Sequence, residues 1–305
     1  MSQPGTDIRE FVQRFPDNDA CLEHLHRVCV GLSGGCPKCG GAEPWRKVGS
    51  RSSWRHSCGA IINPLRDTVF YRSNIPLGIW FYAILLFCNA PNGIRVSHLR
   101  KQTGLGLKST LRLSARIREL FASVRLAGIL GGEGETVALD TIELRCISRP
   151  GCTTLRPATI LAIFANGQVT SRIIPDRRQA TIVKQAQTLL LPGTRIITEQ
   201  HVRYRALGGA EYDHFEINGH AACCDNSDAL SNDLRAYRAA LQRLMKALRQ
   251  VRSENLWLYI AEAEFRFNQR HSGNAAFNGI IGDGAALYNY DPRKAKFQFD
   301  CRTPS

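Results

Sequence analysis

Two carboxylates in the middle of the chain each end a short run of residues typical of a β-strand. Asp140 ends the run that begins at Thr136, and Glu199 ends the run that begins at Arg195. Such strands could place both carboxylates side by side at the edge of one sheet, where they could hold two Mg²⁺ or Mn²⁺ ions. Two ions so held activate a water or a 3′-hydroxyl and stabilise the leaving oxygen of a phosphodiester. Aspartates at strand ends are more often turn caps, so the spacing alone leaves both interpretations open.

A second group of residues has the spacing of a metal site. Cys36-Pro-Lys-Cys39 is followed by a glycine, and this tight loop can aim two thiolates at one ion. Zinc prefers four such ligands in a tetrahedron, and imidazole is an acceptable replacement for a thiolate. His56 and Cys58 stand where a second Cys-x-x-Cys pair would be expected. We therefore expect Cys36, Cys39, His56 and Cys58 to hold a structural Zn²⁺; the alternative is a lapsed site with spare cysteines.

A basic helical stretch follows the cysteines. Helices are predicted over about Val96–Gln102 and Lys108–Val124, and Gly104-Leu-Gly106 forms the turn between them. This is the spacing of a helix-turn-helix, whose second helix enters the major groove of DNA. Four basic residues of that helix could meet phosphates or guanine edges: Lys108, Arg112, Arg116 and Arg118. The alternative is a solvated basic helix beside a core helix.

The charge of the chain favours a polyanionic partner, and double-stranded DNA is the leading candidate. The 305 residues carry a formal net charge of +14 with a sequence pI of about 9.6. Residues 1–130 hold 18 lysines and arginines against 8 acidic residues, a net of +10, whereas residues 131–305 hold 22 against 18, a net of +4. Residues 1–130 are thus expected to bind the polyanion through electrostatic attraction. A merely basic protein without such a partner is the alternative.

No membrane or secretory segment is predicted. The longest apolar run, Ile79–Cys88, is about half the length that a bilayer requires and is typical of a buried helix. The first ten residues lack the basic flank and apolar region of a signal peptide. With 11 cysteines and no such signal, we expect reduced thiols and an intracellular, DNA-associated protein.

Four segments are predicted to form the domains. They are an N-terminal helix within 1–30, capped by Asp7, a metal ribbon over 31–74, a helical segment over 75–127 and an α/β domain over 135–295, with Gly128–Gly134 as a linker. In the last domain, strands are expected over 136–144, 157–164, 169–174 and 194–198, and helices over 179–190, 228–251 and 254–268. The turn Ala165-Asn-Gly167 predicts a hairpin. The fold class is therefore a multidomain α/β protein with helices packed on a mixed sheet.

The order of these pieces resembles the zinc-ribbon insertion-sequence transposases of the ISXO type and their eukaryotic Merlin relatives. The resemblance covers about residues 10–290. The pieces that carry it are Cys36-Pro-Lys-Cys39-Gly, Asp67-Thr-Val-Phe, Ser73-Asn-Ile-Pro-Leu77, Val137-Ala-Leu-Asp140-Thr, Ile174-Pro-Asp176, Thr198-Glu199 with Tyr204, His214 with Ile217-Asn218, and Glu264-Phe-Arg-Phe-Asn268-Gln-Arg270. The resemblance implies an RNase H-like catalytic domain that uses an Asp, a second Asp, then an Asn or Glu followed by a Lys.

The resemblance also assigns roles to residues of this chain, with several departures. Asp140 matches the first Asp, and Glu199 stands at the second. Asn232, or Asp233 beside it, could supply the third ligand. Arg235 stands where many members carry Glu, and Gln242 stands where the Lys is expected. The basic residues of this helix, which include Arg238, could contact DNA phosphates or form a solvated face over its leucines.

The sequence is compatible with two functions. The first is a DNA transposase that binds terminal inverted repeats and target DNA, cleaves with Mg²⁺ or Mn²⁺, and acts as a homo-oligomer because two ends must be joined. The second is a catalytically inactive, transposase-derived DNA-binding protein, which the departures in the ribbon and at Glu199, Arg235 and Gln242 favour.

Overall fold

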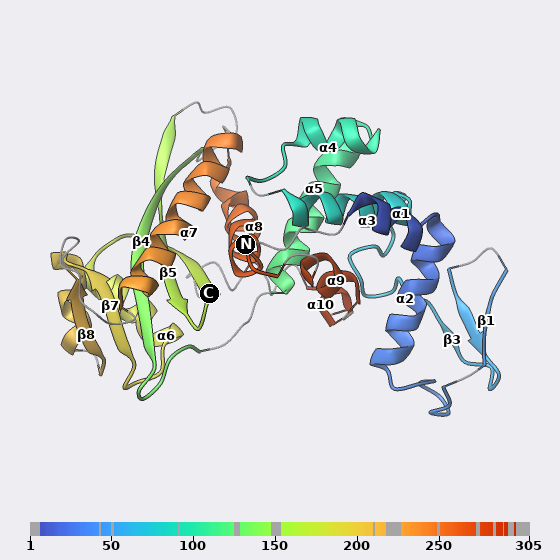
Figure 1. Ribbon diagram of the computed structural model, residues 1–305, viewed down its shortest axis with the longest axis horizontal. Helices are drawn as coiled ribbons and strands as arrows, with labels where there is room; N and C mark the ends of the chain where they lie inside the picture. Colours follow the sequence, from blue (N-terminus) through green and yellow to red (C-terminus); the bar gives the residue numbers. More distant parts are fainter. Residues whose placement is uncertain are drawn as a thin grey trace. The chain divides into compact units, whose positions relative to one another are not determined.

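The computed structural model (Figure 1) divides into two compact units. Unit 1 comprises Met1–Val124 with Gln269–Pro292, and unit 2 comprises Arg125–Asn268 with Arg293–Ser305. The structure describes residues 7–42, 44–49, 52–90, 92–124, 129–147, 154–209, 211–217, 227–248, 251–272, 275–282, 285–288, 290–291 and 296. Within these ranges, no helix combines the length and the apolar character that crossing a membrane requires.

Unit 1 begins with two short helices where the sequence indicated one helical region. They are α1 (Ile8–Arg14) and α2 (Asn18–Leu32), and Pro16 lies between them. As expected, Asp7 caps α1: its carboxylate accepts a hydrogen bond from the Arg9 N–H at 3.3 Å. Because α1 has only two turns, one narrow stripe packs inward: Phe11 is buried, while Ile8 and Val12 are exposed.

The rest of the first part of unit 1 is a small sheet followed by three helices. The sheet pairs β1 (Trp45–Lys47), β2 (Trp54–His56) and β3 (Ile61–Ile62), all antiparallel. The helices are α3 (Leu77–Asn89), α4 (Val96–Thr103) and α5 (Leu107–Ser123). Helix α3 is apolar on most sides and buries six side chains, so it forms the centre of this unit rather than an amphipathic surface helix.

The chain returns to unit 1 after residue 268. Helices α9 (Ala275–Gly282) and α10 (Ala285–Tyr288) lie in this segment. The Phe277 ring meets the rings of Phe11 and Phe15 with centroids 5.9 and 6.3 Å apart, and the Tyr288 hydroxyl donates to the Pro64 carbonyl at 2.7 Å. These contacts place residues 269–292 in unit 1, which corrects the expected α/β domain boundary at residue 295.

Unit 2 is built on a five-stranded mixed sheet of order β6-β5-β4-β7-β8. Its strands are β4 (Thr136–Ile147), β5 (Leu155–Ala165), β6 (Gln168–Ile174), β7 (Arg195–Glu199) and β8 (Asp213–Ile217). The first three pair antiparallel, and β7 and β8 continue the sheet in parallel from β4. The predicted hairpin joins β5 to β6, with Asn166 at φ 51° and Gly167 at φ 80°. Strand β8 was not predicted.

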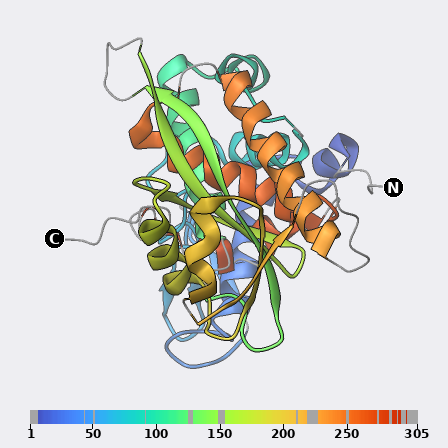
Figure 2. The same ribbon diagram turned by 90° about the vertical axis from the view of Figure 1, so that its left-hand side faces the viewer.

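Helices cover both faces of this sheet (Figure 2). On one face, α6 (Gln179–Leu189) and the 3-10 helix η1 (Val202–Gly209) share a core with the strands that includes Val137, Leu139 and Ile196. Against the other face pack α7 (Ser227–Leu248) and, after η2 (Ser253–Asn255), α8 (Leu256–Asn268). Because strand residues alternate between faces, Asp140 and Glu199 belong to the α7 side.

The expected glycine linker is in part a piece of unit 2. The Leu130 N–H donates to the Leu189 carbonyl at 2.8 Å, and the Leu191 N–H donates to the Leu130 carbonyl at 2.9 Å. Gly131 has φ 76°, and a Cβ there would lie 2.3 Å from the Thr194 hydroxyl oxygen. Only glycine fits this conformation and this approach. Residues 129–134 are thus tied to the sheet, and residues 125–128 lie outside the described residues.

Candidate functional site

The two predicted strand-end carboxylates lie on neighbouring strands, but only Glu199 ends its strand: β4 continues past Asp140 to Ile147. Strands β4 and β7 run parallel with Ala138 opposite Ile197, and Asp140 and Glu199 each follow two residues later. The same alternation therefore directs both side chains to one face. Both line a hollow of about 320 Å³, whose other lining residues include Glu143, Arg177, Arg203, Tyr204, Arg238 and Gln242. The structure thus brings Asp140 and Glu199 together.

Both carboxylate oxygens of Asp140 have hydrogen-bond donors. Its Oδ1 accepts from the Thr141 N–H at 2.7 Å and from the Tyr204 hydroxyl at 3.0 Å. Its Oδ2 accepts a charged hydrogen bond from the Arg238 guanidinium. Burial, together with the nearby Asp140 charge, raises the pKa of Tyr204 to about 12. The Tyr204 hydroxyl therefore stays protonated at neutral pH and remains a donor to Asp140.

Glu199 is paired in the same manner with a second arginine. The Arg235 Nε donates to Glu199 Oε1 at 3.1 Å. The two side chains are 44% and 43% exposed, whereas those of Arg238 and Asp140 are 32% and 11% exposed. The Glu199 pair therefore lies at the rim of the site, and the Asp140 pair lies deeper.

Helix α7 places the two arginines through its periodicity. Leu234, Tyr237, Leu241 and Leu244 form a buried stripe that packs toward the sheet. Arg235 and Arg238 stand three residues apart on the adjacent stripe, which continues to Gln242 in the hollow. The sequence indicated Arg238 only as a possible phosphate contact. Its spacing from Arg235 and Gln242 is the signal that could have placed it beside Asp140.

The expected third ligand is not among the described residues that line the site. Asn232 and Asp233 lie near the start of α7, before Arg235. The described lining residues of the large hollow and of a smaller one beside Leu234 include Asp140 and Glu199 but neither Asn232 nor Asp233. Arg235, which the resemblance aligns with a position where many members carry Glu, instead donates a hydrogen bond to Glu199.

This donor set does not fit two divalent cations. Mg²⁺ and Mn²⁺ are held by carboxylate, carbonyl and water oxygens. Here Asp140 and Glu199 each accept from a guanidinium, and the Arg203 Nη1 donates to the Thr141 hydroxyl beside Asp140 at 3.0 Å. Arginine side chains therefore occupy the positions where a divalent-metal site would need further oxygen ligands.

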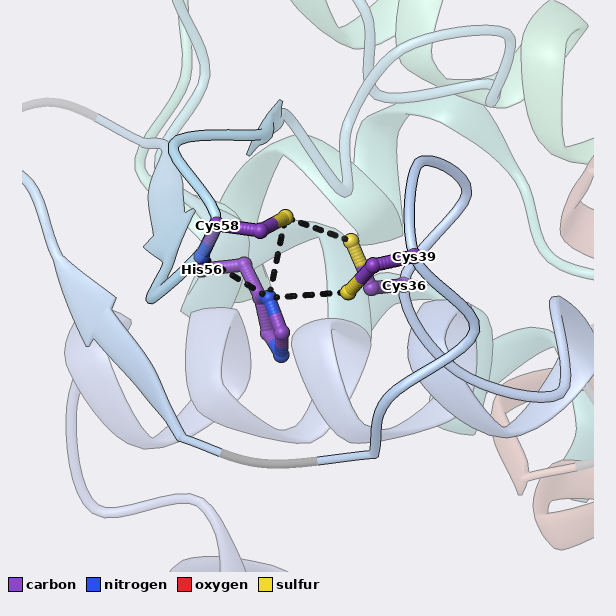
Figure 3. A group of neighbouring side chains, drawn as sticks. All are labelled: Cys36, Cys39, His56 and Cys58. Carbon is purple, nitrogen blue, oxygen red and sulfur yellow. Dashed lines mark hydrogen bonds between the residues drawn. The ribbon is translucent and has the colours of Figure 1, made fainter.

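The cysteine and histidine ligands in unit 1 do converge (Figure 3). The ligand atoms of Cys36, Cys39, His56 and Cys58 all lie within 4.8 Å of one another. Cys36 Sγ lies 3.5 Å from Cys58 Sγ, and His56 Nδ1 lies 3.5 Å from Cys39 Sγ and 3.2 Å from Cys58 Sγ. Ligands in a zinc tetrahedron are spaced by about 3.7 Å, given Zn–S bonds of about 2.3 Å. This Cys₃His group could bind zinc, with His56 Nδ1 as its nitrogen ligand.

Aromatic rings hold the His56 side of the cluster. The Trp45 ring lies against the His56 ring with centroids 4.8 Å apart, and the His26 ring of α2 stacks on Trp54 at 4.4 Å. Gly41 comes close to the same histidine: a Cβ at this position would lie 3.3 Å from His56 Cε1. Packing therefore restricts the orientation of the His56 ring.

A short turn joins helices α4 and α5, and Gly104 in this turn has φ 68°. Lys108 and Arg112 lie one turn apart and are exposed at the start of α5. Arg116 is half-buried and donates from Nη1 to the Val69 carbonyl at 3.2 Å. Arg118 is only 2% exposed and lies over the Phe87 ring at 5.1 Å. Its position on the helix face of Ser114 and Phe121 turns it inward, so Arg118 is not part of the exposed basic surface.

Residues 154–268 match the family described as the ISXO2-like transposase domain. The matched segment includes Glu199, Asn232 and Arg235, and it begins after Asp140 and the whole of the Cys₃His group. No curated protein matches the chain. The match supports a transposase family for this chain and, with it, a transposase-related function that involves DNA.

Proposed function

We propose that this protein is a transposase-derived DNA-binding protein. In this proposal unit 1 holds duplex DNA through α4 and α5, beside a zinc ribbon, and unit 2 is an RNase H-like domain of the ISXO2 type. The observation that supports the class best is the parallel placement of Asp140 and Glu199 on the central strands. The five-stranded sheet of order β6-β5-β4-β7-β8, antiparallel and then parallel, supports the RNase H-like part of the proposal.

The exposed start of α5 supports the DNA-binding part of the proposal. Lys108 and Arg112 present two cations on one helix face, and Leu107 and Leu111 lie exposed beside them. A helix that enters the major groove uses its N-terminal residues in this way. The exposed side chains of Leu107 and Leu111 could contact thymine methyl groups, while Lys108 and Arg112 contact phosphates or guanine edges.

Duplex binding followed by fluorescence anisotropy at several salt concentrations tests this proposal. We expect Lys108→Ala/Arg112→Ala to lower the affinity about tenfold or more and to reduce the salt slope by about 2, one for each phosphate contact. The matched control is Arg178→Ala/Lys184→Ala, which removes the same charge from exposed positions of unit 2. Equal losses in both variants would show that net charge alone, and not α5, binds the DNA.

Metal-dependent cleavage and strand transfer are the second candidate, which the adjacency of Asp140 and Glu199 favours. The test is incubation of a labelled duplex library with Mg²⁺ or Mn²⁺, using the wild-type chain beside Asp140→Ala. We expect no cleavage by either protein, because arginines face both carboxylates. Cleavage by the wild type that Asp140→Ala abolishes would establish the enzyme instead.

A further inference from the structure

We infer that Arg235 and Arg238 act as internal counter-cations of the Asp140–Glu199 centre and exclude divalent metal ions from it. The inference rests on the proposed function in one respect, since it treats the two carboxylates as a transposase-type centre. It adds a specific cause for the loss of chemistry: two guanidinium groups, one for each carboxylate.

Both oxygens of Asp140 already have hydrogen-bond donors. Its Oδ1 already accepts from Thr141 and Tyr204, and its Oδ2 accepts from Arg238. A divalent ion that approaches from the α7 side meets the Arg238 guanidinium, and coordination in its place requires that the guanidinium be displaced. Displacement would leave a part-buried cation without its counter-charge, next to a doubly charged ion.

The charges of the four side chains point to the same conclusion. Asp140 and Glu199 contribute two negative charges, and Arg235 and Arg238 cancel both. A divalent ion added to this neutral group would raise its charge to +2. Cation sites in proteins carry an excess of negative oxygen ligands, so the centre has no net attraction for Mg²⁺ or Mn²⁺.

The backbone of α7 keeps the two arginines over the carboxylates. The stripe of α7 next to the two arginines is buried, and it contains Leu234, Tyr237 and Leu241. The Tyr237 hydroxyl lies 2.8 Å from the Ser171 hydroxyl on β6, which fixes the register of the helix along the sheet. A shift of α7 that withdrew Arg235 and Arg238 would break this buried packing.

Titration of the zinc-loaded 305-residue chain with Mn²⁺, followed by the electron paramagnetic resonance signal of free Mn²⁺, tests the inference. We expect the wild type and Asp140→Asn to bind Mn²⁺ equally, with no Asp140-dependent site up to millimolar concentration. In contrast, Arg235→Glu/Arg238→Gln should gain one bound Mn²⁺, because it removes both cations and adds a carboxylate. Adding Asp140→Asn to this double variant should abolish the gain.

Two results would overturn the inference. One is a wild-type Mn²⁺ site that Asp140→Asn removes. The other is a folded double variant that binds no more Mn²⁺ than the wild type, since the arginines would then not be what excludes the ion. Arg243→Gln, on an exposed position of α7, is the matched control and should leave Mn²⁺ binding unchanged. If the double variant does not fold, Arg235→Gln and Arg238→Gln are titrated singly, and the comparison of wild type with Asp140→Asn decides.

The outcome is separable from that of the proposed function because the titration contains no DNA. Loss of DNA binding in the α5 variant tests unit 1, whereas Mn²⁺ binding tests the centre in unit 2. A chain that binds no DNA could still have the arginine-neutralised centre, and a DNA-binding chain could still bind Mn²⁺ there.

Discussion

The Cys₃His cluster of unit 1 and the carboxylate pair of unit 2 are both groups of metal-binding residue types, and they differ in what faces them. The four zinc-type ligands face one another, and their ligand atoms lie within 4.8 Å of each other. Asp140 and Glu199 instead face two arginines. The side chain opposite each ligand, and not the ligand types alone, therefore separates a group that can hold an ion from one that is already neutralised.

The physical basis of this difference is desolvation and charge. Thiolates brought together without a cation repel one another, so a Cys₃His group is favourable chiefly with its ion. A carboxylate beside a guanidinium already has a charge-assisted hydrogen bond and gains little from a second cation. The same comparison predicts that loss of metal affects unit 1 strongly and unit 2 hardly at all.

The largest expected effect comes from the zinc ligands. We expect Cys58→Ser to release zinc and to unfold β1–β3, because zinc binding contributes about 10–16 kcal/mol in small zinc-dependent folds. The measurement is zinc content together with hydrogen exchange of residues 36–62. Cys88→Ser, which changes a half-buried cysteine outside the cluster, should keep both the zinc and the protection. Retention of a full equivalent of zinc by Cys58→Ser would contradict the assignment of four ligands.

A smaller effect is expected from the Asp140–Arg238 pair. A double-mutant cycle with Asp140→Asn and Arg238→Met should give a coupling of about 1–3 kcal/mol in the free energy of unfolding of unit 2. The reason is that the 11% exposed Asp140 side chain loses its charged partner away from solvent. Urea unfolding followed by circular dichroism measures it. A coupling near zero would show that the two side chains do not pair in solution.

The smallest effect is expected from the Glu199–Arg235 pair. Its side chains are 43% and 44% exposed, so solvent screens their attraction. The cycle with Glu199→Gln and Arg235→Gln should give a coupling of about 0–1 kcal/mol, which falls as salt is added. The same urea experiment at low and high salt measures it. A coupling free energy larger than that of the Asp140–Arg238 pair would contradict the prediction that the more buried pair is the stronger one.

Much of the local structure could be predicted from short stretches of sequence. The hairpin at Asn166-Gly167 was expected because these residues tolerate positive φ, and both adopt it. The strand that begins at Thr136 and the helix that begins at Gln179 were expected, although this strand continues to Ile147 and does not end at Asp140. Asp7 was expected as a helix cap because apolar residues at helical spacing follow it, and it caps α1. Each of these features depends on neighbours within a few residues.

Features that depend on distant residues were not predictable in this way. Strand β8 is mostly exposed at the edge of the sheet, so it lacks the alternating apolar pattern that marks a half-buried strand. Residues 269–292 join unit 1 through contacts such as that of Phe277 with Phe11. Arg118 has a basic side chain of the kind that binds DNA, but it lies on a buried face of its helix, over the Phe87 ring.

The sequence by itself determined the ligand types, the presence of Asp140 and Glu199 on strands, and the basic character of α5, because these follow from residue identity and local spacing. Only the tertiary structure decided which charges meet. Glu199 lies 36 residues from Arg235 and Asp140 lies 98 from Arg238 along the chain, and they pair because α7 packs across β4. A charge interacts with whatever the fold brings within a few ångströms of it, and this distance in space is independent of distance along the chain.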